Sequence, residues 1–593
     1  MLIPSRTCRF VGTHWPNVLG VTGLLLALAT GACSARLPQA ESQASQVPGS
    51  SLLLANLVII NARVWTGAEN GLKPGDPNEP TAVAIAGDKI IAVGSDAAVQ
   101  KLLGPDTKVI DAGGRRVIPG ITDCHTHVIS GGFHLARLNL RDAANRDEFI
   151  QAIGDDARTK AKGEWVLGGR WSVESWPRVV QPNRSWIDPV TGDTPVYLSR
   201  MDGHQALVNS AALKLAGIDA SGPPDPKGGE IERDPQTHEP TGILKESATD
   251  LVSELIPDPT DAERDAAIRR AMKHANSLGV TSVNDMSQPE NLDVFHRAEQ
   301  RGELTMRITS YMYEEDWAKC ISNFPSYELN SDMLRLVGLK GFMDGSLGSR
   351  TAYMREPYSD NTPDEPYPRG QLTAMADPPE KFNDLVAMAD AKGLQLAVHS
   401  IGDEGNHLLL NAYEYAQRRN GRREANHRIE HAQHLHVVDI PRFAKLGVVA
   451  SMQPFHKADD GRYAEKAIGS DRLKGSYAFR QLVDAGALVI FGSDWPVVSL
   501  NPFLGIDSAV NAKTLAGEVW LPSHSLTVEE ALRAYTVLPP RAIHRGDVLG
   551  TIEVGKYADL VILEDDVLTI PKDRLADVKV VKTIVDGNVV FER

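Results

Sequence analysis

The chain has 593 residues, of which 42% are hydrophobic and 23% are charged. These ordinary globular fractions exclude a chain that is disordered or membrane-embedded throughout. Its 62 Lys+Arg against 77 Asp+Glu give a formal net charge of −15, which argues against a basic nucleic-acid-binding face, so no nucleic-acid partner is expected. Four cysteines are too few for a disulfide framework in a chain of this length.

The first 32 residues have the features of a secretory signal peptide. Arg6 and Arg9 precede an apolar run at 18–29 that is too short for a stable spanning helix. The small residues before Cys33 resemble a bacterial lipobox, although Thr30 stands where an aliphatic residue is usual. We expect an exported protein, periplasmic or membrane-anchored through a lipid on Cys33, with plain secretion and an uncleaved anchor as alternatives. Residues 33–52 are rich in Ser, Gln, Ala and Pro and predict a flexible tether.

Short β-rich segments at both ends of the remaining chain predict one small sheet domain. Gly87-Asp88 separates two alternating apolar runs, as a hairpin turn does. Residues 545–593 contain similar short β-rich segments. The two ends, 53–119 and 545–593, therefore predict a composite β-sandwich domain, with a larger domain at 120–544 inserted between them.

The segment 120–544 alternates strand-like and helix-like stretches, which favours an α/β fold of the (β/α)₈, TIM-like barrel type. A helix is predicted at 260–278, where Thr260 and Glu263 form a capping box, and another begins at Thr527, with Glu530 in the same position. A doubly wound open sheet is the rival fold, but no G-x-G-x-x-G follows a strand. Barrel strands are expected at 121–128, 281–285, 306–313, 337–344, 394–400, 427–432, 447–453 and 488–494.

The stretch 141–262, after the first barrel strand, is too long for a single connection inside a compact domain. It predicts an inserted subdomain over one face of the barrel. Its four tryptophans favour contact with a partly apolar or aromatic substrate, or they form the core of the insertion itself: Trp165, Trp171, Trp176 and Trp186.

Imidazoles and a carboxylate stand at the ends of four predicted strands. His125 and His127, two residues apart in ITDCHTHV, share one face of the first strand. His399, His431 and Asp494 end the fifth, sixth and eighth strands. Since strand ends converge at the carboxyl rim of a barrel, the set predicts a divalent metal site. Taken singly, His399 and His431 are also explained as polar residues of the barrel mouth.

Lys340 lies on the fourth predicted strand, where an ammonium group would be repelled by divalent cations. Reaction with CO₂ would give an anionic carbamate whose two oxygens can bridge two ions. The alternative is an ion pair with Asp344 in the barrel wall.

These residues together resemble the amidohydrolase superfamily. The main motifs are GGRRVIPGITDCHTH at 113–127 and GTIEVGKYADLVILEDD at 550–566. HSIGDEGNH at 399–407, RIEHAQH at 428–434, SMQP at 451–454 and FGSDWPV at 491–497 extend the resemblance. LKGFMDGSLGSRTAYM at 339–354 and RMDGHQALVNSAAL at 200–213 are similar to the YtcJ-like branch, amidohydrolase family 3, which includes N-substituted formamide deformylases.

The resemblance implies a ligand set for one or two ions, with zinc expected ahead of manganese, iron or nickel. His125, His127 and Asp494 would hold the first ion, His399 and His431 a second, and N6-carboxylated Lys340 would bridge them. The resemblance also implies that Arg200, Asp202 and His204 of the insertion line the substrate pocket, where an ordinary polar turn is the alternative. Glu246 is a further candidate.

The predicted reaction is hydrolysis of a C–N bond in a small-molecule amide, N-substituted formamide or cyclic amide. Hydroxide formed at a divalent ion attacks the carbonyl, and Asp494 acts as general base and then general acid. Ester or lactone hydrolysis at the same site is one alternative, and a non-catalytic exported binding lipoprotein is another. The sequence leaves open whether the protein is a homo-oligomer.

Overall fold

The computed structural model describes residues 54–593, except 74, 142, 172, 174–175, 179, 201–204, 227–228, 315, 325–328 and 362–366. The predicted signal peptide, the tether and Cys33 lie outside the described residues. Among the described helices, none combines the length and the apolar character needed to cross a bilayer.

The largest sheet has eight strands, and each hydrogen-bonded pair in it is parallel. Each strand overlaps one predicted from the sequence, so the TIM-like barrel is confirmed. In chain order the strands are β7 (Ile121–Thr126), β14 (Val280–Ser287), β15 (Arg307–Tyr313), β16 (Leu334–Phe342), β17 (Gln395–Ser400), β18 (Arg428–His431), β19 (Val449–Met452) and β20 (Val489–Phe491).

The barrel closes between its first and last strands. Thr126 forms a parallel bridge with Trp495, and the backbone N–H of His127 donates to the Trp495 carbonyl over 2.8 Å. The Asp494 N–H likewise donates to the His125 carbonyl over 2.7 Å. Closure therefore places two predicted site residues, 369 positions apart (494 − 125), side by side.

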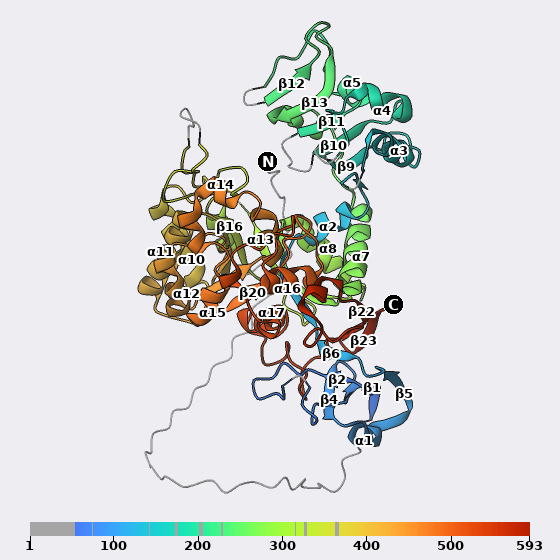
Figure 1. Ribbon diagram of the computed structural model, residues 1–593, viewed down its shortest axis with the longest axis vertical. Helices are drawn as coiled ribbons and strands as arrows, with labels where there is room; N and C mark the ends of the chain where they lie inside the picture. Colours follow the sequence, from blue (N-terminus) through green and yellow to red (C-terminus); the bar gives the residue numbers. More distant parts are fainter. Residues whose placement is uncertain are drawn as a thin grey trace, which may run out of the picture. The chain divides into compact units, whose positions relative to one another are not determined.

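Helices cover the outside of the barrel and bury its largest apolar core. Figure 1 shows α7 and α8 on one flank and α10, α11 and α12 on another. The two predicted capping boxes are present, Thr260 with Glu263 before α7 and Thr527 with Glu530 before α17. These helices are α7 (Asp261–Ser277), α8 (Pro289–Gln300), α10 (Pro379–Ala391), α11 (Asp403–Asn420), α12 (Ile440–Leu446), α16 (Pro502–Asn511) and α17 (Val528–Tyr535).

Strands from both ends of the described chain build two further sheets that share a core. One sheet has the order β4-β3-β1-β5 and the other β2-β6-β21-β22-β23. Ile59, Ile85, Leu560 and Ile584 meet in one buried cluster, and Figure 1 shows the blue and red strands together. The strands are β1 (Ala55–Ile60), β2 (Arg63–Val64), β3 (Ala82–Ala86), β4 (Lys89–Gly94), β5 (Leu103–Asp111), β6 (Arg116–Pro119), β21 (Leu560–Leu563), β22 (Val580–Val585) and β23 (Asn588–Glu592).

A sheet of six strands, in the order β12-β13-β11-β10-β9-β8, lies between β7 and β14 in the sequence. Trp165, Trp171 and Trp176 are buried in its own two apolar clusters, and Trp186 packs against one of them. The tryptophans therefore form the core of the insertion and give no support to an aromatic substrate. The strands are β8 (Leu138–Asn139), β9 (Val166–Trp171), β10 (Val196–Arg200), β11 (Gln205–Val208), β12 (Gly229–Arg233) and β13 (Pro240–Glu246).

Gly338 on β16 has no room for a side chain, because an added Cβ would lie 1.6 Å from the Gln395 carbonyl oxygen of β17. The neighbour is backbone, so relief requires the two barrel strands to separate. We expect Gly338→Ala to lower the free energy of unfolding by about 3 kcal/mol or more, measured by urea denaturation. Gly94→Ala is the matched control, since its nearest contact would be Ala98 Cβ at 3.9 Å. Equal midpoints for both variants would contradict this packing.

Candidate metal centre

Two predicted site residues, one at the end of a barrel strand and one shortly after another, have left-handed backbone. His431 ends β18 with a φ of 73°, and Asp494 follows β20 with a φ of 61°. Residues other than glycine rarely adopt this region, and such strain concentrates at functional sites. The backbone thus departs from extended strand geometry at the two residues whose side chains are predicted to bind metal.

The carboxylate of Asp494 lies between imidazoles. Its Oδ1 is 3.2 Å from His127 Nε2 and 3.6 Å from His125 Nε2. One ligand-capable atom each from His125, His431 and Asp494 all lie within 4.8 Å of one another, and the three residues are buried. Nitrogen and oxygen donors converging at this spacing fit a divalent ion such as zinc.

His399 and Lys340 adjoin the same cluster. The ring centroids of His399 and His431 are 4.4 Å apart, and Lys340 Nζ is 3.3 Å from His125 Nε2. The structure therefore gathers all six residues predicted as metal ligands, which come from four strand ends and, for Lys340, from strand β16 of the barrel wall.

Lys340 is 1% exposed, and burial lowers the pKa of its ammonium to about 8. The alternative partner, Asp344, accepts backbone N–H bonds from Tyr353, Ile401 and Gly402 over 2.8–3.0 Å. Asp344 thus organises the loops after β16 and β17, and the Lys340 ammonium lies against His125 instead.

Each of three imidazoles is oriented by an oxygen acceptor. His125 Nδ1 donates to Glu430 Oε2 over 2.6 Å, His431 Nδ1 to Gln453 Oε1 over 2.7 Å, and His399 Nε2 to the Gly345 carbonyl over 3.0 Å. In a neutral imidazole the remaining ring nitrogen is an unprotonated acceptor, the form that binds metals. Burial, reinforced by Lys340, lowers the pKa of His125 to about 4 and that of His399 to about 3, so both rings are neutral at pH 7.

Sequence reasoning missed Glu430 and Gln453. The Glu430 carboxylate is fully buried and receives two bonds from Arg428, over 2.7 and 3.1 Å. The sequence does contain a signal for Glu430. In RIEH, an Arg and a Glu two residues apart lie on a short strand that ends at a predicted ligand. Charged residues at that period on a barrel strand indicate an ion pair inside the barrel.

Arg170 was also missed, and it joins the insertion to the loop that carries Asp494. This β9 residue has a φ of 56°, and its guanidinium donates to the carbonyls of Pro496 and Val497 over 2.9 and 3.1 Å. Asp123 supports the same region from the barrel, since its Oδ1 accepts the Ser493 N–H over 2.9 Å.

The residues predicted to line the substrate pocket are only partly described. Arg200 ends β10, with its guanidinium 5.9 Å from the centroid of the Trp171 ring. Asp202 and His204 lie outside the described residues, as does the side chain of Glu246, which ends β13.

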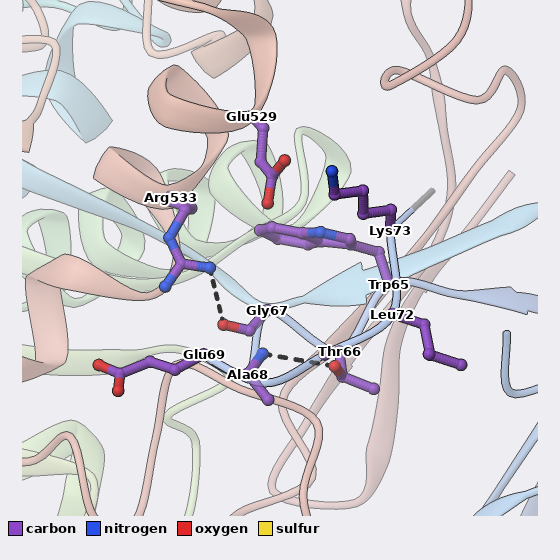
Figure 2. Close-up of a pocket in the computed structure, with 10 residues that line it drawn as sticks. Trp65, Thr66, Gly67, Ala68, Glu69, Leu72, Lys73, Glu529 and Arg533 are labelled. Carbon is purple, nitrogen blue, oxygen red and sulfur yellow. Dashed lines mark hydrogen bonds between the residues drawn. The ribbon is translucent and has the colours of Figure 1, made fainter. Parts of the chain in front are cut away.

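A pocket of about 320 Å³ lies elsewhere, between residues 65–73 and α17. Figure 2 shows Glu529 and Lys73 near the Trp65 ring, and Arg533 donating to the Gly67 carbonyl over 3.0 Å. Its lining includes none of the six predicted ligands, so this pocket is separate from the candidate metal centre.

The buried histidines make the stability of the metal-free protein depend on pH. Burial lowers the pKa of His434 to about 3, as it does that of His399. Below about pH 6.5 the unfolded chain protonates these rings while the folded protein does not, so stability falls as the pH falls. At pH 5.5 each such group costs about 1.4 kcal/mol. Urea denaturation of chelator-treated protein should show this loss between pH 7.5 and 5.5, and a flat profile would contradict neutral rings.

A closed barrel with buried imidazoles and a carboxylate at its carboxyl rim defines the class of metal-dependent barrel hydrolases. The amidohydrolase family matches residues 108–591, and the chain belongs to this family. The putative amidohydrolase YtcJ of Bacillus subtilis (strain 168) is 31% identical over 89% of this chain and 99% of its own. The N-substituted formamide deformylase of Arthrobacter pascens is 30% identical over 91% and 99%. The resemblance to the YtcJ-like branch is thus confirmed.

The chain is also similar to a further relative and to a solved structure. The protein LONG AFTER FAR-RED 3 of Arabidopsis thaliana is 37% identical over 86% of this chain and 87% of its own. The crystal structure of an uncharacterized metal-dependent hydrolase from Pyrococcus horikoshii OT3 matches 87% of this chain and 99% of its own, with a TM-score of 0.70 and 27% identity. The chain is a metal-dependent hydrolase that acts on carbon–nitrogen bonds.

Proposed function

We propose that this hydrolase cleaves the C–N bond of a small amide, with N-substituted formamides as the first substrates to test, using zinc held by the six clustered residues. The buried donor set of His125, His431 and Asp494 carries the proposal. The similarity to a protein named for deformylation of N-substituted formamides supports the substrate class.

A divalent ion in this cluster would supply hydroxide at neutral pH, by lowering the pKa of water from 15.7 towards about 7, and would polarise the carbonyl. Asp494 takes the proton released by the attacking water and passes it to the leaving nitrogen. The water oxygen becomes part of the acid product, and the nitrogen departs as an amine. Glu430 and Gln453 hold their imidazole partners in fixed orientations throughout.

Carboxylation of Lys340 is part of the proposal. The Lys340 ammonium first loses one proton, and the neutral amine then adds to CO₂ and releases a second, so that a buried cation becomes an anion beside the imidazoles of His125 and His399. Reconstitution with ¹³C-bicarbonate and zinc should give a carbamate resonance in the wild type and none in Lys340→Arg. Identical spectra would remove the carbamate from the account while leaving the histidine and aspartate ligands in place.

The test of function is a substrate panel with zinc or manganese added. N-benzylformamide, N-acetylbenzylamine and a cyclic amide are compared with benzyl formate, the matched ester. Amine release that stops with a chelator and returns with metal supports the proposal. Hydrolysis of the ester without any amide would favour ester or lactone hydrolysis instead.

The proposed location is outside the cytoplasm, with the chain held at a membrane through a lipid on Cys33. The proposal depends on the sequence of residues 1–33. Palmitate labelling of the full chain should be lost in Cys33→Ala, and labelling that survives this change would contradict it.

A further inference from the structure

His456 brings an additional imidazole to the cluster from a segment that carries none of the six predicted ligands. It lies on α13 (Pro454–Asp460), directly after β19 and Gln453. Its backbone N–H donates to the Gln453 carbonyl over 3.1 Å. The same short segment thus carries Gln453, which orients His431, and an imidazole whose ring is parallel to His431, with an interplanar angle of 11° and 6.2 Å between centroids.

The Nε2 atom of His456 is buried and has no hydrogen-bond partner, in a side chain that is 14% exposed. A buried imidazole nitrogen without a partner loses its hydration without compensation, which costs about 1–3 kcal/mol. Buried polar groups are almost always paired, and the exceptions are often found where a ligand supplies the missing bond.

The two carboxylate oxygens of Asp494 face different sides of the site. Its Oδ1 faces His125 and His127, whereas its Oδ2 lies 4.0 Å from His456 Nε2. That separation is too long for a direct hydrogen bond. It is short enough for both atoms to contact one substrate held between them.

We infer that His456 is a catalytic residue whose Nε2–H donates a hydrogen bond to the substrate's carbonyl oxygen as negative charge develops there. This inference rests on the proposed function, because it assigns a role in the same hydrolysis. A donor fixed before the reaction stabilises the transition state without reorganisation.

His456 and Asp494 differ in their roles in proton transfer. The proton from water travels through Asp494 to the leaving nitrogen, and the C–N bond breaks as the amine departs. His456 keeps its own proton throughout, so its hydrogen bond strengthens as the carbonyl oxygen becomes an oxyanion and weakens when the acid product forms.

Three variants test the inference in the full, metal-loaded protein. His456→Ala removes the donor and should lower kcat by about 10²–10³-fold, with little change in KM or in metal content. His456→Gln places an amide N–H near the position of Nε2 and should recover most of that loss. His407→Ala is the matched control, since His407 lies on α11 and pairs with Asp439 over 2.9 Å.

Two readouts distinguish a donor from a structural residue or a proton carrier. Binding of a phosphonamidate analogue of the tetrahedral intermediate should weaken in His456→Ala by the same factor as kcat. The pH dependence of kcat in His456→Gln should keep the wild-type shape, whereas loss of one limb would make His456 an acid or base and overturn the donor role.

The outcomes also separate this inference from the proposed function. If the wild type hydrolyses amides and His456→Ala keeps its kcat, the inference fails while the proposed function stands. If the wild type hydrolyses only esters, the proposed function fails. A loss of ester kcat in His456→Ala would then still support the inference, because ester hydrolysis forms the same oxyanion, and no loss would overturn it.

Discussion

Asp494→Asn is expected to lower kcat for amide hydrolysis by about 10²–10⁴-fold while the protein stays folded. The amide keeps the size of the carboxylate and its backbone bond to the His125 carbonyl. It cannot accept a proton from water at neutral pH, so both the general-base step and the transfer to the leaving nitrogen fail. The measurement is kcat and KM on the amide that the wild type hydrolyses fastest.

Asp507→Asn is the matched control for this variant. Asp507 lies on α16, half-buried, and accepts a hydrogen bond from Asn511 over 2.6 Å, a role that an amide oxygen can keep. We expect wild-type kcat for the control and equal thermal midpoints for both variants. A wild-type kcat in Asp494→Asn would remove Asp494 from the proton transfer.

Glu430→Gln should weaken both the fold and zinc binding. Arg428 is fully buried, and Glu430 is its carboxylate partner, so the amide leaves a buried cation uncompensated at a cost of about 3–5 kcal/mol. Loss of the carboxylate that orients His125 should lower zinc affinity about 10–100-fold. Urea denaturation measures the first effect, and competition with a chelator measures the second.

Glu404→Gln provides the comparison, because Glu404 pairs with Arg355 over 2.7 Å at a partly exposed position. Such a pair contributes about 1 kcal/mol or less, and this pair touches no predicted ligand. Equal stability and equal zinc affinity in the two glutamine variants would show that the buried pair has no special role.

The barrel could be predicted from the sequence because each strand is a short apolar run followed by polar residues. The residues at which the strands end could be predicted less precisely. The eighth strand was predicted at 488–494 but β20 ends at Phe491, because the chain turns out of the sheet towards Asp494, whose φ is 61°. The sixth was predicted to 432 but ends at His431, which has a φ of 73°. A left-handed backbone conformation at a residue other than glycine has no recognisable pattern in the local sequence.

The candidate ligands could be predicted because parallel strands bring their carboxyl ends to one rim. The residues that support them could not. Glu430 acts through Arg428 and His125, which come from different barrel strands, and Arg170 acts through carbonyls more than three hundred residues away. His456 lies on a helix that follows a strand, and it does not itself end a strand. A search for histidines at strand ends therefore does not find it. Such partnerships form only when the barrel closes.

The most direct measurement of the central claim is the metal content of the purified protein, by elemental analysis after dialysis against trace zinc. We expect about one to two divalent ions per chain in the wild type and in His407→Ala. We expect near-complete loss in the double variant His125→Ala/His431→Ala, with all three proteins folded by circular dichroism. A wild type that retains no divalent ion, or a double variant that retains the full amount, would contradict it.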